Sequence, residues 1–305
     1  MKGTAMLTAR GRSVLISFLV LIASYTAKAQ DRVFVLNLDS LNIQSDFDCT
    51  QYTLSTEALY PVNQKVHLYN LLPKSHRHRS EIIVFAVLPD FEKKSSWTEI
   101  KRTDIREISY SELLNFKDRS LGITTNPPYF TRSINQIKLA ILHNGKLKVG
   151  NQTFLQFFAV RNYVDGMNRP LGTIDIGQPF ISIYSFSEAF KRQYPDDSFP
   201  MLPERISSSF EPLRMKKEFL SKKLTIEGEE AYRFWTFYDW STADGYEIER
   251  GLDRFVYMPG RGIVGASLDF YFFFHLRHNG LTNRALIQNM WEEKVMLADE
   301  LTGRL

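Results

Sequence analysis

The sequence predicts an α+β fold that is predominantly antiparallel β-sheet, arranged as a meander with a few helices. Two observations lead to this fold class. Beyond the first 30 residues, hydrophobic residues come in short runs, and runs of about four to eight residues are the usual length of strands. Helical patterns are few and do not alternate regularly with strands, so a doubly wound parallel sheet is not expected.

Residues 1–29 have the organisation of a cleavable secretory signal peptide. A basic start precedes an apolar stretch at 14–23, and a small-residue cleavage site follows at 27–29. The apolar stretch is too short for a bilayer-spanning helix, which needs ~20 residues. We therefore expect cleavage after Ala29 and an exported soluble protein with no transmembrane anchor, located in the periplasm, in the cell envelope or outside the cell.

Removal of the signal peptide changes the charge of the chain. The 305 residues carry a formal net charge of +4, and residues 1–29 contribute four basic residues and no acidic one, so the mature chain is neutral. A neutral chain lacks the positive surface that phosphate binding requires, which argues against a nucleic-acid partner. The densest basic run, at 74–79, is interpreted as a solvated loop.

Cys49 is the only cysteine, so no intramolecular disulfide can form. No cation lies close to it in the sequence to stabilise a thiolate, and we expect a buried, unreactive thiol that packs as a small hydrophobe. The stability of the fold must then come from its hydrophobic core, which a chain of this length can supply.

The region 30–200 is predicted to be rich in strands. Ser109 and Ser185, each followed three residues later by a glutamate, predict the starts of two short helices. Asn144 and Gly145 tolerate the positive φ angles of a two-residue hairpin turn. Runs of β-branched and aromatic residues predict strands at 32–38, 65–71, 81–88, 137–143, 146–149 and 154–163.

A segment rich in proline and serine, between residues 195 and 209, marks a candidate boundary. The region 201–305 beyond it is predicted to form a helix, a β-meander and a closing helix, with one continuous domain for the whole mature chain as the alternative. The predicted elements are a helix at 211–221, strands at 223–227, 231–240, 252–258 and 263–276, turns at 228 and 259–262, and a C-terminal amphipathic helix from Thr282 to about Leu301.

The strand predicted at 263–276 has the clearest pattern in the chain. Its even positions from Val264 to Leu276 are all apolar, which predicts a buried inner face that includes Phe272. Asp269 would then lie on the opposite, partly solvated face.

The polar and aromatic segment 239–249 contains the candidate catalytic carboxylates Asp244, Glu247 and Glu249. In an extended chain Glu247 and Glu249 would lie about 7 Å apart on one face, a separation that inverting glycosidases use. Trp240 and Tyr246 are candidate ligand-binding residues, because their rings could stack on a sugar. Pairs of exposed glutamates are common on strands, so the segment is interpreted first as a solvated loop, with ligand binding and catalysis as the alternatives.

Two further candidate ligand-binding residues, Tyr271 and His275, come from the polar face of the predicted strand at 263–276. His275 and His278 could bind a metal with Asp253 or Asp269 as a third ligand. On a strand, however, positions 275 and 278 face opposite sides. A hydrogen-bonded structural histidine is the favoured interpretation, and neither a metal site nor a cofactor is predicted.

The sequence lacks a G-x-S-x-G elbow, an H-E-x-x-H motif, a P-loop and a paired C-x-x-C. It therefore favours a non-catalytic binding or interaction protein that presents a β-sheet surface to a protein or carbohydrate ligand. Two alternatives remain. One is a secreted glycan-acting hydrolase that uses the carboxylates of 239–249, and the other is a structural subunit of an envelope assembly.

Overall fold

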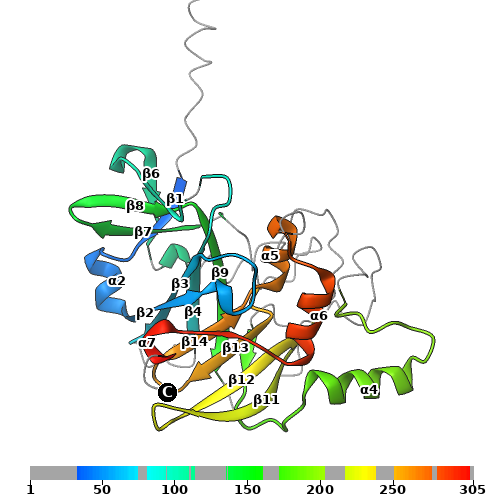
Figure 1. Cartoon of the computed structure of the whole chain (residues 1–305). Coiled ribbons are helices and arrows are strands. Elements are labelled where there is room, and N and C mark those ends of the chain that lie inside the picture. Colours follow the sequence, from blue (N-terminus) through cyan, green and yellow to red (C-terminus); the bar gives the residue numbers. More distant parts are fainter. Residues whose placement is uncertain are drawn as a thin grey trace, which may run out of the picture.

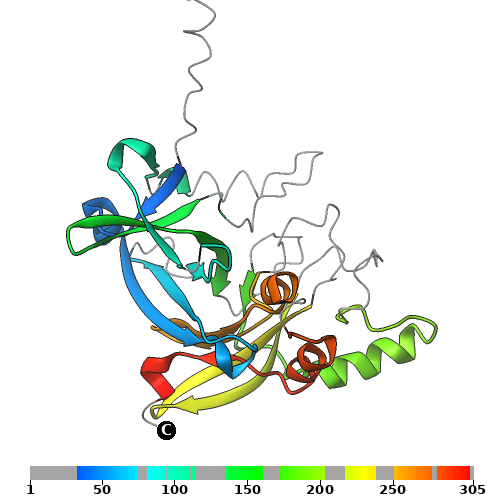
Figure 2. The ribbon, with the colours of Figure 1, turned by 45° about the horizontal axis from the view of Figure 1, so that its top comes forward.

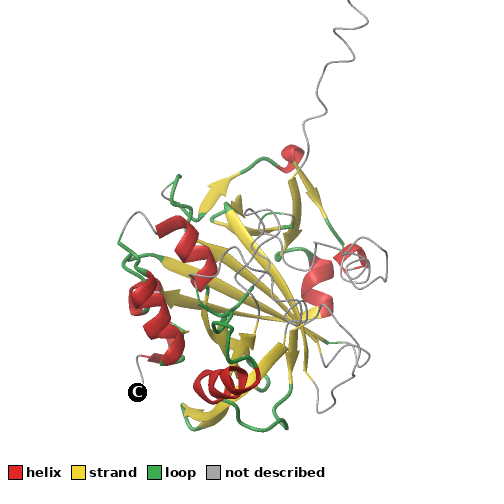
Figure 3. Cartoon of the chain, turned by 90° about the vertical axis from the view of Figure 1, so that its right-hand side faces the viewer, coloured by secondary structure: helices red, strands yellow, loops and turns green. Residues whose placement is uncertain are grey.

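The computed structural model describes residues 33–74, 81–93, 95–109, 111–113, 135, 137–160, 172–202, 217–237, 251–276 and 280–302. The strands within these ranges form three five-stranded sheets, which we name sheets A, B and C. Most strand pairs are antiparallel, and a few helices surround the strands (Figures 1 and 3). The predicted α+β class is confirmed.

Sheet B is the central layer. It contains, in spatial order, β10 (Gly172–Ile174), β9 (Gln152–Val160), β4 (Glu81–Leu88), β3 (Lys65–Pro73) and β2 (Phe47–Ser55). Along β4, Ile82 and Val84 pack into a core shared with sheet C, whereas Ile83 and Phe85 pack into a core shared with sheet A. Both faces of β4 are therefore buried, which explains its unbroken apolar sequence.

Sheet C is antiparallel throughout. Its order is β11 (Lys217–Ile226), β12 (Glu229–Phe237), β13 (Arg254–Met258), β14 (Gly262–Ser267) and β15 (Met296–Leu297). Its inner face packs on sheet B, where the ring of Phe255 lies 5.0 Å from Phe158 and 5.2 Å from Phe234. The edges of the two sheets also meet, since β10 contacts β11 and Leu54 of β2 forms a bridge with Ala298.

Sheet A is small and covers part of the other face of sheet B (Figure 2). Its order is β5 (Trp97–Glu99), β8 (Lys146–Gly150), β7 (Lys138–His143), β1 (Val33–Asn37) and β6 (Ile105–Glu107). The edge strands β5 and β6 are separated by residues 100–104 alone, which include the 3-10 turn η2 (Arg102–Asp104). Such a short connection requires the sheet to roll up, and the rolled sheet encloses its own apolar cluster.

The helices occupy the periphery of the sheets (Figure 3). Ile183 and Met290 pack onto the outer face of sheet C, against Phe219 and Trp235. No helix among the described residues is long and apolar enough to span a bilayer. The helical elements are α2 (Leu41–Asp46), η1 (Thr56–Ala58), α4 (Ile183–Gln193), α5 (Asp269–Leu276), α6 (Asn283–Trp291) and α7 (Asp299–Thr302).

Several local predictions are confirmed. The six strands predicted before residue 164 correspond to β1, β3, β4, β7, β8 and β9 within the described residues. Asn144 and Gly145 have φ angles of 52° and 72° in the turn between β7 and β8. Ser109 forms both bonds of the capping box, since its hydroxyl accepts from the Glu112 N–H and its own N–H donates to the Glu112 carboxylate. Residues 238–240, at the end of one predicted strand, lie outside the described residues, as does most of the basic run at 74–79.

The strand predicted at 263–276 is wrong beyond Ser267, because residues 269–276 form helix α5. This helix is apolar almost all round and is buried on several sides. Its apolar residues therefore fit the period-two pattern of a strand as well as the pattern of a helix. Asp269 does not face solvent. It is 3% exposed and forms an ion pair with Arg254.

The prediction of a single closing helix from Thr282 to about Leu301 is also wrong. Helix α6 ends at Trp291, and Glu293 adopts a φ of 50°. The chain then forms β15, which pairs with β14, before the short helix α7. Backbone pairing at the edge of sheet C therefore outweighs the helical pattern of the sequence.

Three smaller predictions are corrected. Residues 217–221 belong to strand β11 rather than to a helix, while 211–216 lie outside the described residues. Helix α4 begins after Ser182, whose hydroxyl accepts from the Ser185 N–H, so Ser185 lies in the first turn and is not the cap. Cys49 is exposed rather than buried, because it lies on the edge strand β2. The boundary near residue 200 stays a prediction.

Candidate functional site

The segment 239–249 lies outside the described residues. The candidate catalytic residues Asp244, Glu247 and Glu249, and the candidate ligand-binding residues Trp240 and Tyr246, therefore have no described geometry. Their roles stay predictions.

Tyr271 and His275 lie on α5 in an aromatic cluster. Tyr271 is buried, and its hydroxyl donates to the Pro89 carbonyl. The exposed ring of His275 lies 4.4 Å from Tyr271 and 5.6 Å from Phe91. Loss of water around the imidazole lowers the pKa of His275. The structure thus places Tyr271 away from solvent and packs His275 against two aromatic rings.

The two aspartates proposed as metal ligands have other partners. Asp269 accepts from both terminal nitrogens of Arg254, at 2.6 and 3.1 Å, and from the Tyr60 hydroxyl at 2.8 Å. Asp253 is buried and accepts from the Phe270 N–H at 3.4 Å. No group of three or more metal-binding side chains occurs among the described residues, which do not include His278. The Arg254–Asp269 pair therefore holds α5 on sheet C.

Residues 260–265, Gly-Arg-Gly-Ile-Val-Gly, match the G-x-G-x-x-G spacing of dinucleotide-binding proteins. That motif requires a strand followed by a helix, with the glycines at the helix N-terminus. Here Gly260 and Arg261 lie in the turn between the antiparallel strands β13 and β14, and residues 262–265 belong to β14. Gly262 has a φ of 83° and packs against the Asn70 side chain, so this glycine serves the packing of sheets B and C.

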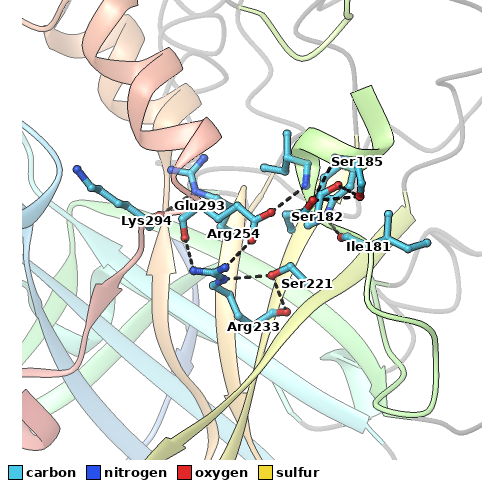
Figure 4. Close-up of polar contacts among 10 residues, drawn as sticks. Ile181, Ser182, Ser185, Ser221, Arg233, Arg254, Glu293 and Lys294 are labelled. Carbon is cyan, nitrogen blue, oxygen red and sulfur yellow. Dashed lines mark hydrogen bonds and ion pairs between the residues drawn. The ribbon is translucent and has the colours of Figure 1, made fainter. Parts of the chain in front are cut away.

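A second ionic cluster lies on the outer face of sheet C (Figure 4). Arg233 donates to Ser221 Oγ at 3.1 Å and to the Glu293 carboxylate at 2.7 Å. The other oxygen of Glu293 accepts from the Ile183 N–H at 2.8 Å, at the start of α4. Because the helix N-terminus and the guanidinium both attract a carboxylate, this cluster fastens α4 to the sheet.

A further group of polar and aromatic side chains lies on the face of sheet B that is turned toward sheet A, at the margin formed by β2 and β3. Gln51 is paired with Tyr69 and Thr53 with His67, so each pair projects toward the same face. Trp97 of β5 packs against this margin. We define the Trp97 surface as Gln51, Thr53, His67, Tyr69 and Trp97.

The aromatic rings of the Trp97 surface support one another. The Trp97 ring lies 6.1 Å from His67 and 6.3 Å from Tyr69, which meets it edge to face. Tyr69 is buried, His67 and Trp97 are half-buried, and Gln51 is exposed. This gradient arises because sheet A covers β4 and β9 but does not extend fully over β2.

Three polar side chains of the Trp97 surface, those of Gln51, Thr53 and His67, form no hydrogen bond with any other described residue. Loss of water lowers the pKa of His67, so its ring is neutral at pH 7. Burial likewise raises the pKa of the Tyr69 hydroxyl, which stays protonated. The surface thus presents uncharged donors and acceptors beside an aromatic ring.

Cys49 lies on the same face, two residues before Gln51. Loss of water around the sulfur, with the Asp39 carboxylate as a second cause, raises the pKa of the thiol to about 11. The thiol is therefore protonated at neutral pH and is no candidate nucleophile, even though the residue is exposed.

Sequence reasoning missed this surface because it missed β2. The alternation was available, since Tyr52 and Leu54 point into the core and Gln51 and Thr53 point away from it. Nothing in the sequence indicated that Trp97 would join them. No protein-family model, curated protein or solved structure matches the chain.

Proposed function

We propose that the protein is an exported, non-catalytic binding protein and that its ligand site is the Trp97 surface. One observation carries the proposal: polar side chains that form no hydrogen bond with other described residues lie on two neighbouring strands and share a face with a half-buried tryptophan. Binding sites commonly combine an aromatic or apolar surface with a few convergent polar groups.

The ionic clusters support the non-catalytic part of the proposal. Asp269 and Glu293 are buried acidic groups, and each is neutralised by an arginine and by further hydrogen bonds. Such pairs are typical of structural networks rather than of a general acid or base, which needs a pKa close to the working pH.

Export rests on the organisation of residues 1–29. We expect the mature protein to begin at Gln30, and the measurement is the intact mass or N-terminal sequence of material recovered from outside the cytoplasm. Membrane-bound protein that retains residues 1–29 would contradict the proposed location.

The binding site can be located by fluorine NMR of the mature chain grown with fluorotryptophan. The chain has four tryptophans, and the Trp97→Phe variant identifies the resonance of Trp97. The probes are neutral oligosaccharides, acidic oligosaccharides and short peptides. We expect at least one probe class to shift the Trp97 resonance and to leave that of the fully buried Trp235 unchanged. A Trp97 resonance that no probe shifts would refute the proposed site.

A further inference from the structure

We infer that the ligand of the Trp97 surface is an uncharged carbohydrate, stacked on Trp97 and hydrogen-bonded by Gln51, Thr53 and His67. This inference rests on the proposed function and adds the chemical class of the ligand. Three features of the surface support this inference: its aromatic ring, its neutral hydrogen-bonding groups, and the neighbouring Glu300 carboxylate, which disfavours an acidic ligand.

The aromatic ring suits a sugar because a pyranose has one flat face of C–H groups. Trp97 is held by Tyr69 at an interplanar angle of 87° and by His67 at 51°, so its orientation is fixed before a ligand binds. A fixed ring loses little conformational freedom on binding, which favours affinity.

The polar groups match the hydroxyl groups of a sugar, each of which both donates and accepts. Gln51 offers two donors and an acceptor, Thr53 a hydroxyl, and neutral His67 one donor and one acceptor. Gln51 and Thr53 are two residues apart on β2 and point to the same face. The hydrogen-bonding groups therefore form a row beside the aromatic ring.

Charge argues against an acidic ligand. The Glu300 carboxylate is close to this surface, where both its oxygens accept from the Thr53 N–H, at 3.0 and 3.1 Å. Lys65, a described cation that acts on His67, forms an ion pair with Asp299 at 2.8 Å. A ligand that carries carboxylate, phosphate or sulfate groups would therefore meet the negative charge of Glu300 beside Thr53.

The edge of β2 argues against a peptide that binds by strand addition. Such a peptide needs free backbone groups along an edge strand. Glu300 already accepts from the Thr53 N–H, and Leu54 forms a bridge with Ala298. These contacts occupy the edge beside Thr53 and shorten the run of backbone groups with which a peptide could pair.

The test is isothermal titration of the mature chain, residues 30–305, with neutral oligosaccharides of glucose, galactose, mannose and N-acetylglucosamine. Oligogalacturonides and short peptides serve as the comparison. We expect at least one neutral oligosaccharide to bind more tightly than every acidic oligosaccharide and peptide. Three variants locate the binding: Gln51→Ala, Trp97→Ala, and Tyr184→Ala as the matched control, since Tyr184 is an exposed aromatic residue elsewhere on the protein.

We expect Gln51→Ala to weaken binding about 2- to 10-fold, Trp97→Ala to weaken it by at least about 10-fold, and Tyr184→Ala to leave it unchanged. Because Gln51 is exposed, its variant should fold even if the Trp97 variant does not. Tighter binding of an acidic oligosaccharide or a peptide, lost in both site variants, would overturn the ligand class and leave the proposed function standing. Neutral sugars that bind all variants equally would overturn both, and a panel in which no neutral sugar binds would overturn the inference.

Discussion

The buried pair Arg254–Asp269 provides the sharpest test of the structure. The side chain of Arg254 is 2% exposed and that of Asp269 is 4% exposed. Replacing Asp269 by alanine would leave a buried guanidinium without its counter-ion and would remove the acceptor of the Tyr60 hydroxyl. Breaking a buried ion pair from one side costs about 3–5 kcal/mol. With a urea dependence of about 2 kcal/mol per molar, the unfolding midpoint of Asp269→Ala should fall by roughly 2 M.

The assay is urea unfolding followed by circular dichroism, with two comparison variants. Glu230→Ala removes an ion pair with Lys223 in which both side chains are largely exposed, and we expect a far smaller change in the midpoint. The double variant Arg254→Met with Asp269→Leu removes both charges together and should recover part of the lost stability. Equal midpoints for Asp269→Ala and Glu230→Ala would refute the burial of this pair.

Three further outcomes are expected. Replacing Phe272, which is fully buried on α5, by alanine should lower the free energy of unfolding by about 3–5 kcal/mol. Thermal unfolding that matches wild type would contradict its position in the core. Gly262→Ala should destabilise the protein more than Gly260→Ala in the same assay. Both glycines have positive φ, but only at Gly262 would an added Cβ lie 2.6 Å from Asn70. The thiol pKa of about 11 predicts that iodoacetamide alkylates native Cys49 more slowly than the denatured chain at pH 8, with the rate rising as the pH approaches 11.

Much of the fold could be predicted from the sequence because local signals and tertiary packing agree. The strand β4 was predicted with its observed bounds, since an unbroken run of apolar residues suits a strand that is buried on both faces. The turn at Asn144 and Gly145 is specified by backbone preference alone. In these segments the neighbouring residues decide the conformation.

Helix α5 could not be predicted because the spacing of apolar residues distinguishes a helix from a strand only when one face of the element is solvated. Asp269 and Tyr271 lie on what a strand would present as its polar face, yet they are 3% and 1% exposed. Arg254 and the Pro89 carbonyl, both distant in the sequence, satisfy the polar atoms of these two residues. The polar residues at 269 and 271 are therefore explained by their tertiary partners and not by exposure to solvent.

The Trp97 surface could not be predicted for a related reason, since its residues come from three strands in two sheets. The arrangement of sheet B nevertheless explains why polar groups are exposed there. Glu218 accepts from the Thr173 N–H at one edge of the sheet, and Glu300 accepts from the Thr53 N–H at the other. A carboxylate thus protects each edge of sheet B, and a neighbouring sheet packs on each of its faces. The exposed polar side chains on β2 are therefore not explained by the need to protect an open edge strand. Their exposure follows from the limited width of sheet A, and this is the geometric reason for placing the ligand site beside Trp97.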